Sequence, residues 1–557
     1  MMKVIATMFI ASFYIITRSY DMLIMSATHK LDEKNFIKQV LQHGYIAEQI
    51  PTCFDATSFA YHANALLPLI SIDKKGTLPT TLSTYKNDIS RRVLSLPNPE
   101  AFLRVVKLMA DNWNEIKSAA ESQNSLSPIT YIHSYHNKIF AELIKTELIN
   151  NETMRDYMHS KSDYLDGTIK CIKTSLGYKY RLDLDVANFY NTIYTHSITW
   201  AMCGKKNAKK YLITQQPTSI KKKYELADQL DKYIRIQKNT ETNGIVVGPF
   251  TSRIFSEMIM AELDRKLIER GFVFRRYVDD YKFYFRTESQ AQESLPIIEK
   301  VLNEYCLNIN PAKTEIHRYP FDIISPIQTT LEEILQQKKG LNSGVFGVLN
   351  AAAQFQLSGH KGAYKYVLKM LKGHDIPSED FDIIMPSLIN IMLIDPKYGK
   401  YVINYLKQNN KKLDKEKLSK IMNHELASSI KNELQQESLL FMQIFMELSL
   451  NLNANNLLNI LKSGDDFSII IALDIWKNKN KYVQRTRSEA TKIKKAINSL
   501  VIELNGETMS GSHWLLLHEI LMHKLIDANI IPVINRNSFF KELIRLNISF
   551  YMSIKNK

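Results

Sequence analysis

Three aspartates stand where strands are expected to end, and together they could bind divalent metal ions. Asp279 and Asp280 lie between aromatic residues that alternate with the period of half-buried strands, so we expect a hairpin with both acids at its turn. Asp185 ends another strand-like run, residues 178–186. Carboxylate oxygens are ligands that Mg²⁺ prefers. Three acids converging from two strand ends are what a two-metal phosphoryl-transfer site needs.

Two further segments carry weaker signals of the same kind. Residues 244–252 place two glycines before an expected helix over residues 253–267, where glycine lets a substrate approach the backbone closely. Residues 307–314 form a turn that leads to Lys313. Each feature alone is more often a solvated turn, helix punctuation or a surface lysine. Their combination with the three acids is what indicates a site.

The elements expected to position these residues change in character near residue 320. Before it, helical patterns alternate with aromatic and β-branched runs such as residues 178–186 and 272–285. After it, strand signals nearly vanish and apolar residues recur at helical spacing. The segments concerned are 364–371, 385–394, 401–406, 439–450, 467–476 and 514–526. We therefore expect an α+β region followed by an all-α region, built either as stacked helical pairs or as an irregular bundle.

The acidic pair Asp465–Asp466 is a useful contrast to Asp279–Asp280. It follows Ser463 and Gly464 and opens an apolar run. Helix capping accounts for such a pair without any chemistry. We expect a helix to begin there.

The amino-acid composition limits which classes of protein this chain can belong to and which kinds of partner it can bind. The chain has 557 residues, enough for two or three domains, and its 45% hydrophobic and 23% charged residues are typical of globular proteins. The formal net charge of +15 favours a polyanionic partner such as nucleic acid over a merely basic surface. Four scattered cysteines form no C-x-x-C pair, which argues against structural zinc and a disulfide framework and suits a cytoplasmic protein.

The N-terminal segment combines Lys3 with an apolar run over residues 4–16. This run is too short to span a bilayer, and residues 17–20 are not a signal-peptidase site. Met25 opens a segment that is typical of a cytoplasmic start. We expect residues 1–24 to be a dispensable extension and the protein to have no stable membrane association.

The order of these segments resembles the palm motifs A to D of reverse transcriptases. The matching patterns are D-x-x-x-F-Y at 185–190, G-x-x-x-G-x-x-x-S at 244–252, Y-x-D-D at 277–280 and L-x-x-N-x-x-K-T at 307–314. Residues 90–99 are similar to the S-R-R-x-x-x-x-P-N-P segment upstream of the palm in bacterial reverse transcriptases. Within that superfamily the chain is most similar to the defence-associated, abortive-infection (Abi-like) group, which also carries a long helical-repeat domain. The palm and fingers resemblance covers roughly residues 60–320.

The resemblance implies a right-hand fingers–palm core with an RRM-like palm sheet over residues 25–320. Motif A would occupy 181–193, motif B 244–256, motif C 275–285 and motif D 302–315. An all-α, HEAT-like helical-repeat domain would follow over residues 321–557.

Site roles carry over from the same resemblance. It implies metal-binding roles for Asp185, the Val186 carbonyl, Asp279 and Asp280, and nucleotide-binding roles for Tyr190 as steric gate, Gly248 and Ser252 beside the nascent base pair, and Lys313 near the pyrophosphate. A bulky ring at Tyr190 would exclude a ribose 2′-OH.

Some positions depart from the pattern or leave alternatives. Val246 and Val247 replace the Pro and Gln usual in motif B, which puts ordinary nucleotide contacts in doubt. Asp183 shares a strand face with Asp185 and could be a supporting acid. The finger residue that grips the triphosphate stays open among Arg155, Lys161 and Lys170.

The resemblance predicts DNA synthesis from dNTPs with Mg²⁺ or Mn²⁺, on an RNA template or without one, in anti-phage defence. A protein primer and a homo-oligomer are plausible by the same analogy. Two alternatives remain: a catalytically silent nucleic-acid-binding scaffold that retains the palm, and an RNA-synthesising palm polymerase, for which Tyr190 is the wrong gate.

Overall fold

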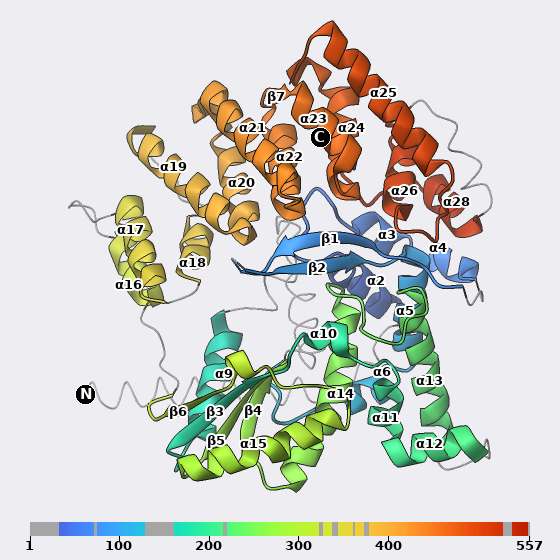
Figure 1. Cartoon of the computed structure of the whole chain (residues 1–557), viewed down its shortest axis with the longest axis vertical. Helices are drawn as coiled ribbons and strands as arrows, with labels where there is room; N and C mark the ends of the chain where they lie inside the picture. The colour runs from blue at the N-terminus through green and yellow to red at the C-terminus, as the bar shows by residue number, and fades with distance from the viewer. Residues whose placement is uncertain are drawn as a thin grey trace, which may run out of the picture.

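The computed structural model describes ten stretches of the chain. They are residues 33–71, 75–87, 89–127, 161–214, 220–321, 327–336, 344–359, 362–371, 378–526 and 537–554. The expected extension, residues 1–24, and Arg155 lie outside them. In Figure 1 a small sheet with its helices forms the lower part of the molecule, an arch of helices forms the upper part, and a β-hairpin runs between them.

The central sheet has four antiparallel strands in the order β4-β5-β3-β6. Their bounds are β3 Tyr180–Asp185, β4 Phe274–Tyr277, β5 Asp280–Phe285 and β6 Glu315–Arg318. The register places Leu184 opposite Tyr281 and Asp185 opposite Asp280. Because side chains alternate between the faces of a sheet, one face is apolar and the other carries the acids. The α+β class and the hairpin at Asp279–Asp280 are confirmed.

Two long helices, α14 (Phe250–Glu269) and α15 (Glu288–Asn303), pack beside this sheet (Figure 1). Phe274, Tyr281 and Phe283 are fully buried on the apolar side and join the main hydrophobic core. The helix α14 begins directly after the glycines of residues 244–248, as expected. The opposite face carries Asp185, which is buried, and Asp280, which is exposed, so this face is open only where the strands end at Asp280.

The remaining helices of the first part surround this core. They are α2 Glu33–Gly44, α3 Thr57–Tyr61, α4 Ala63–Leu66, η1 Leu67–Leu69, α5 Pro99–Asp111, α6 Trp113–Ala120, α9 Lys161–Thr174, α10 Phe189–Thr192, α11 Ser197–Cys203, α12 Lys205–Thr214, α13 Lys221–Ile236 and η2 Pro311–Lys313.

A separate antiparallel hairpin, β1 (Thr80–Tyr85) with β2 (Arg91–Leu96), precedes the palm in sequence. It leads into α5, where Asn98 caps the helix by accepting hydrogen bonds from the backbone of Glu100 and Ala101, and Pro99 is the first helical residue. The Pro-Asn-Pro segment singled out in the sequence therefore ends this hairpin and starts the next helix. We call β1–β2 the fingers hairpin below.

After residue 321 the described chain is almost entirely helical, as expected. The elements are α16 Ile327–Gln336, α17 Gly344–Leu357, α18 Ala363–Met370, α19 Ser378–Ile394, η3 Pro396–Tyr398, α20 Gly399–Gln408, η4 Asn410–Lys412, α21 Lys415–Lys431, α22 Gln435–Leu448, β7 Leu452–Asn453, α23 Ala454–Ser463, α24 Asp466–Asn478, η5 Asn480–Tyr482, β8 Val483–Gln484, α25 Arg487–Leu504, α26 Trp514–Met522 and α28 Ser538–Arg545. The pair β7–β8, two residues in each strand, is the one departure from an all-α region among the described residues. The Asp465 side chain accepts from the Ser468 amide and caps α24, so the capping prediction is confirmed. A HEAT-like repeat stays a prediction.

The helical region is docked on the first part of the chain at several places. The glutamines that open α22 accept from the edge of β1: Gln435 from the Ser83 amide at 2.6 Å and Gln436 from the Tyr85 amide at 2.7 Å. Near the C-terminus, Tyr551 forms a β-bridge with Phe54. No helix among the described residues is long and apolar enough to cross a membrane.

Candidate active site

The hairpin turn brings the predicted acids together. Asp280 begins β5 directly opposite Asp185 at the end of β3, and the Val186 amide donates to the Asp279 carbonyl at 3.3 Å. Cross-strand partners point to the same face, so the Asp185 and Asp280 side chains share the open face of the sheet. Two strand ends thus deliver three carboxylates to one place, as the sequence pattern predicted.

Asp185 is held by the segment that follows α15. The Asn310 side chain donates to one carboxylate oxygen at 2.8 Å, and the Lys313 ammonium lies 3.0 Å from the other. Asp185 is 7% exposed, whereas the side chain of Lys313 is 57% exposed. Burial alone would lower the pKa of Lys313, but the hydrogen bond and charge of Asp185, with the charge of Asp280, raise it. The lysine singled out by spacing therefore enters the site as a cation that faces solvent.

The other two acids hold their protons more tightly than isolated carboxylic acids do. Burial first, and then the charge of Asp185, raises the pKa of Asp279, against the opposing charges of Lys313 and Arg92. Burial and the charge of Asp279 raise the pKa of Asp280 to about 7, with the Asp185 carboxyl as a further cause. Among the described residues, the charges of Lys313 and Arg92 oppose this concentration of negative charge, and an additional cation would relieve it further.

The carboxylate oxygens are suitable ligands for divalent metal ions, although the acids do not form a complete coordination site. Among the described residues there is no group of three or more His, Cys, Asp or Glu side chains already placed as a metal site. Both oxygens of Asp185 are occupied, by Asn310 and Lys313. Each carboxylate oxygen has two lone pairs, so a metal ion would bind Asp185 beside these two donors.

Metal binding at these acids is expected to tighten as the pH rises. Asp280, with a pKa of about 7, must lose its proton before it can bind a cation, and its charged fraction grows about tenfold between pH 6 and pH 8. Titration of the protein with Mn²⁺ at the two pH values should show about tenfold tighter binding at pH 8. Asp280→Asn should remove most of this dependence. Equal affinities at both pH values would show that Asp280 is not involved.

The turn between β4 and β5 is strained, and hydrogen bonds with Ser127 and Arg276 stabilise it. Val278 has a φ of +55°, a conformation that β-branched residues rarely adopt. Its amide donates to the Ser127 hydroxyl at 3.1 Å, and its carbonyl accepts from Arg276 at 2.7 Å. These two contacts fix the peptide groups on both sides of Val278 and so set the direction of Asp279.

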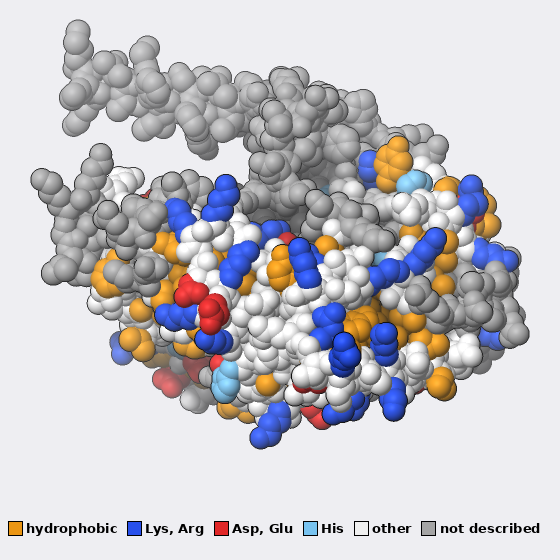
Figure 2. Space-filling view, turned by 90° about the horizontal axis from the view of Figure 1, so that it is seen from above, with side chains coloured by type: hydrophobic (Ala, Val, Ile, Leu, Met, Phe, Trp, Pro, Cys, Tyr) orange, Lys and Arg blue, Asp and Glu red, His pale blue; other side chains and the backbone are white. Residues whose placement is uncertain are grey.

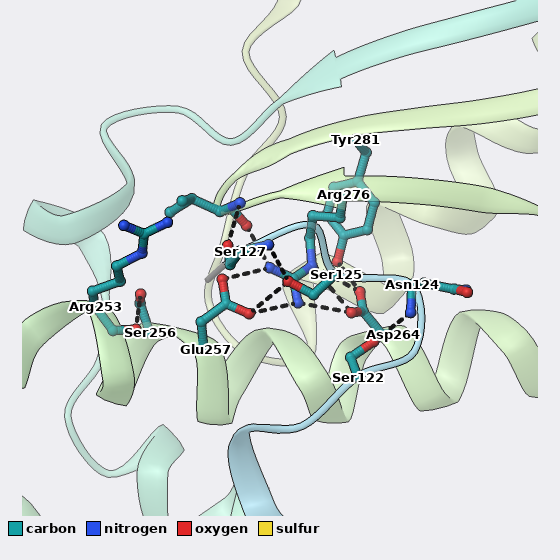
Figure 3. A network of polar contacts seen from close by, with 11 residues as sticks. Ser122, Asn124, Ser125, Ser127, Arg253, Ser256, Glu257, Asp264, Arg276 and Tyr281 are labelled. Atoms are coloured by element: carbon teal, nitrogen blue, oxygen red, sulfur yellow. Dashed lines mark hydrogen bonds and ion pairs between the residues drawn. The ribbon is translucent and has the colours of Figure 1, made fainter. Parts of the chain in front are cut away.

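Arg276 points toward Glu257 and Asp264 of α14 (Figure 3). It is paired with Tyr281 in the sheet and therefore lies on the face opposite to that of Asp280. It is completely buried, and its guanidinium donates to Asp264 and Glu257 at 2.7–3.1 Å in addition to the Val278 carbonyl. Tyr281 donates to the same Asp264 carboxylate at 3.0 Å. All N–H groups of the Arg276 guanidinium therefore have a hydrogen-bond acceptor. A buried ion cluster on α14 therefore supports the catalytic turn.

The predicted nucleotide-binding positions of motif B fall on the loop before α14. Gly248 has a φ of +125°, and an added Cβ would lie 2.9 Å from that of Ala47, so glycine is required there. Ser252 is buried and its hydroxyl donates to the Val246 carbonyl at 2.6 Å, which stabilises the loop. The roles of Gly248 and Ser252 in binding nucleotide stay predictions.

Tyr190 follows β3 by one short turn and packs toward the start of α14. Burial raises the pKa of its phenol, and a hydrogen bond with Ser256 partly offsets this. The nearby charges of Arg253 and Asp279 also act on the phenol. Tyr190 therefore lies between the motif B helix and the acids, at a position where a ring could exclude a 2′-OH.

Asp183 does not join the three acids. It pairs with Arg181 at 2.6 Å and with His317 at 3.3 Å, farther along the sheet. Asp185, the residue favoured by its spacing to Tyr190, is the acid that faces Asp280.

Two cations at the site were missed by sequence reasoning. Arg92 on β2 is close enough to Asp279 for its charge to lower the pKa of that carboxyl. Its position in Ser-Arg-Arg was the available signal, because alternation on a strand turns Arg91 and Arg92 to opposite sides. Arg253 on α14 lies over the Tyr277 ring at 5.7 Å, and two of its guanidinium nitrogens have no hydrogen-bond partner among the described residues (Figure 3). Lys161 and Lys170, two of the sequence candidates for the residue that grips the triphosphate, lie on α9, and that role stays a prediction.

Comparison with known proteins agrees with this geometry. Residues 123–342 match the family model described as reverse transcriptase (RNA-dependent DNA polymerase). No sequence match to a curated protein is found.

Solved structures similar to this chain include two from Candida. Telomerase from Candida albicans in complex with a TWJ fragment of telomeric RNA is 13% identical, with a TM-score of 0.26, over 60% of this chain and 62% of that one. Apo telomerase from Candida tropicalis is 11% identical, with a TM-score of 0.29, over 80% of this chain and 76% of that one. The chain thus spans somewhat under two thirds of the Candida albicans protein. Scores this low establish no correspondence over the whole chain.

Proposed function

Because residues 123–342 carry a reverse-transcriptase domain, which implies RNA-directed DNA polymerase activity, we propose that Asp185, Asp279 and Asp280 form its catalytic site. The observation that carries this proposal is the cross-strand pairing of Asp185 with Asp280 beside the Asp279 turn. The reaction adds a deoxynucleotide from a dNTP to a 3′-hydroxyl and releases pyrophosphate.

The proposed mechanism divides the work among residues of the sheet and its surroundings. Mg²⁺ or Mn²⁺ bound by the three acids, with the Val186 carbonyl, would activate the 3′-hydroxyl and stabilise the leaving pyrophosphate. Lys313, exposed beside Asp185, would neutralise the departing phosphates. Arg92 on the fingers hairpin would contact the triphosphate, since it is a cation whose charge acts on Asp279.

The finer function rests on resemblance. We propose an Abi-like role in anti-phage defence, in the cytoplasm, supported by the similarity of residues 90–99 and by the long helical region after the palm. That region would be a HEAT-like repeat. Template-independent synthesis, a protein primer and assembly into a homo-oligomer belong to the same proposal.

The template and primer requirements can be separated in one experiment. Purified protein is supplied with labelled dNTPs and Mg²⁺ or Mn²⁺, with a primed RNA or with no nucleic acid. Product without nucleic acid that migrates with the protein supports the Abi-like proposal. Product only with primed RNA contradicts it and supports conventional reverse transcription.

Tyr190→Ala is expected to admit ribonucleotides. Removing the ring opens space at the 2′ position, so the preference for dNTP over rNTP, measured as a ratio of kcat/KM, should fall by about 10- to 100-fold. Synthesis with dNTPs should continue. An unchanged ratio would remove Tyr190 as the gate and favour the alternative of an RNA-synthesising polymerase.

Arg92→Gln is expected to weaken nucleotide binding. Loss of a charge-assisted contact to a phosphate should raise the KM for dNTP by about tenfold or more. The neighbouring Arg91 pairs with Glu437 of α22 through two hydrogen bonds of 2.6 and 2.9 Å, which fixes the strand that carries Arg92.

Glu437→Gln should therefore raise the same KM by a smaller factor, with kcat retained. Steady-state kinetics of both variants would show whether the KM for dNTP rises more in Arg92→Gln than in Glu437→Gln. A larger effect of Glu437→Gln than of Arg92→Gln would contradict this prediction.

The silent-scaffold alternative predicts nucleic-acid binding without synthesis. The presence of all three acids together with Lys313 argues against it, since a scaffold has no need of a strained, charge-dense turn.

A further inference from the structure

The segment from η5 to the middle of α25 concentrates positive charge on the surface. Residues 477–495 contain eight Lys or Arg and a single acid, Glu489. Six of these cations are exposed: Lys481, Arg485, Arg487, Lys492, Lys494 and Lys495. We call these six residues the basic face. Viewed from above, the right half of the molecule shows blue side chains with little red among them (Figure 2).

The cations of the basic face have no acidic side chain of the described residues within ion-pair distance. By contrast, Lys117, Lys420 and Arg545 each pair with an acid within one helical turn: Glu121, Glu416 and Glu542. None of the six forms an ion pair with an acid of the described residues. The single acid, Glu489, is used to cap its own helix through Thr486.

The placement of these charges does not serve the stability of α25. Acidic side chains are favourable near the N-terminus of a helix and basic ones near its C-terminus. Here Arg487 is the first residue of the helix, where a cation is unfavourable, and Glu489 in the same turn offsets it. Lys492, Lys494 and Lys495 lie beyond the first turn and before the last one, so the helix dipole does not account for them.

We propose that the basic face binds the phosphate backbone of a nucleic acid. The helical part of it, from Arg487 to Lys495, is about 12 Å long, which suits several successive phosphates. In Figure 1 α25 lies on the upper right and the palm sheet at the lower left, so this surface is separate from the acids. The choice of nucleic acid as the polyanion rests on the proposed polymerase function.

The test compares two full-length variants with four charges removed from each. Arg487→Gln, Lys492→Gln, Lys494→Gln and Lys495→Gln are combined in one. Lys411→Gln, Lys417→Gln, Lys420→Gln and Lys431→Gln, all exposed near or on α21, form the matched control. Fluorescence anisotropy with 20-nucleotide RNA and DNA, without dNTPs and with EDTA, measures binding between 50 and 200 mM salt.

The basic-face variant should bind RNA or DNA at least about tenfold more weakly at 50 mM salt. The slope of log affinity against log salt should lose about 3 in magnitude, since each contact to a single strand contributes about 0.7. The control should bind like the unaltered protein. Loss of binding to RNA alone supports the proposal with an RNA partner.

Three results would overturn the proposal: unchanged affinity and slope, an equal loss in the control, or a loss confined to binding of anionic phosphatidylserine vesicles. Polymerisation on a short primed RNA is assayed in parallel. This assay tests the polymerase function separately from nucleic-acid binding by the basic face. Absence of synthesis in the unaltered protein, with binding still lost in the basic-face variant, would reject the polymerase function and leave the basic face supported.

Discussion

Asp185→Asn is expected to abolish polymerisation while the protein stays folded. The substitution keeps the size of the side chain but removes the negative charge that a catalytic cation needs, and stabilisation by such a cation amounts to several kcal/mol. The rate of nucleotide incorporation should therefore fall by about 1,000-fold or more. The fold should persist because Asn310 can still donate to the amide oxygen and because repulsion of Asp280 is relieved.

The matched control lies on the same strand. Asp183 stands two residues away and differs in pairing with Arg181 and His317 instead of facing the turn. Asp183→Asn should keep activity within about tenfold of the unaltered protein, because its partners Arg181 and His317 lie farther along the sheet and not at the turn. An Asp183→Asn variant that is as inactive as Asp185→Asn would mean that the wrong acid has been assigned.

Arg276→Met is expected to destabilise the protein by about 3–5 kcal/mol. It would leave Glu257 and Asp264 buried without their cation, and breaking a buried pair is costly for this reason. The loss of the hydrogen bond to the Val278 carbonyl would also release the strained turn. Urea unfolding should show a lower midpoint, and activity per folded molecule should fall.

A neighbouring arginine separates the loss of the buried ion cluster from the loss of any arginine on this strand. Arg275→Met serves as control, since Arg275 contacts Thr174 and a backbone carbonyl instead of buried acids. A deficit that is equal for Arg275→Met and Arg276→Met would contradict the account.

The ends of the strands and the open face of the site could be predicted from local patterns in the sequence. Aromatic alternation predicted the β4–β5 hairpin, and the spacing of Asp185 to Tyr190 favoured Asp185 over Asp183 as the third acid, whereas the place of Lys313 beside Asp185 followed from the resemblance to motif D. These signals work because a strand has a fixed period and because charged residues at strand ends are rare unless something binds them.

The support of the site could not be predicted in the same way. Arg276 was visible in the sequence, but its partners Glu257 and Asp264 lie on a helix whose face toward the sheet is set by packing. The pairing of Arg91 with Glu437 joins residues about 350 positions apart, and no short-range pattern records such a contact. The φ of Val278 is likewise a result of its contacts, since the residue type favours the opposite.

The most direct test of the central claim is incorporation of labelled dNMP by the purified protein with Mg²⁺ or Mn²⁺. Primed RNA, unprimed RNA and no nucleic acid would each be supplied, beside a variant combining Asp279→Asn and Asp280→Asn. Metal-dependent incorporation by the unaltered protein, absent from the variant, is the predicted result. Incorporation that survives in the variant, or none by the unaltered protein under any of these conditions, would contradict the assignment of a polymerase site to Asp185, Asp279 and Asp280.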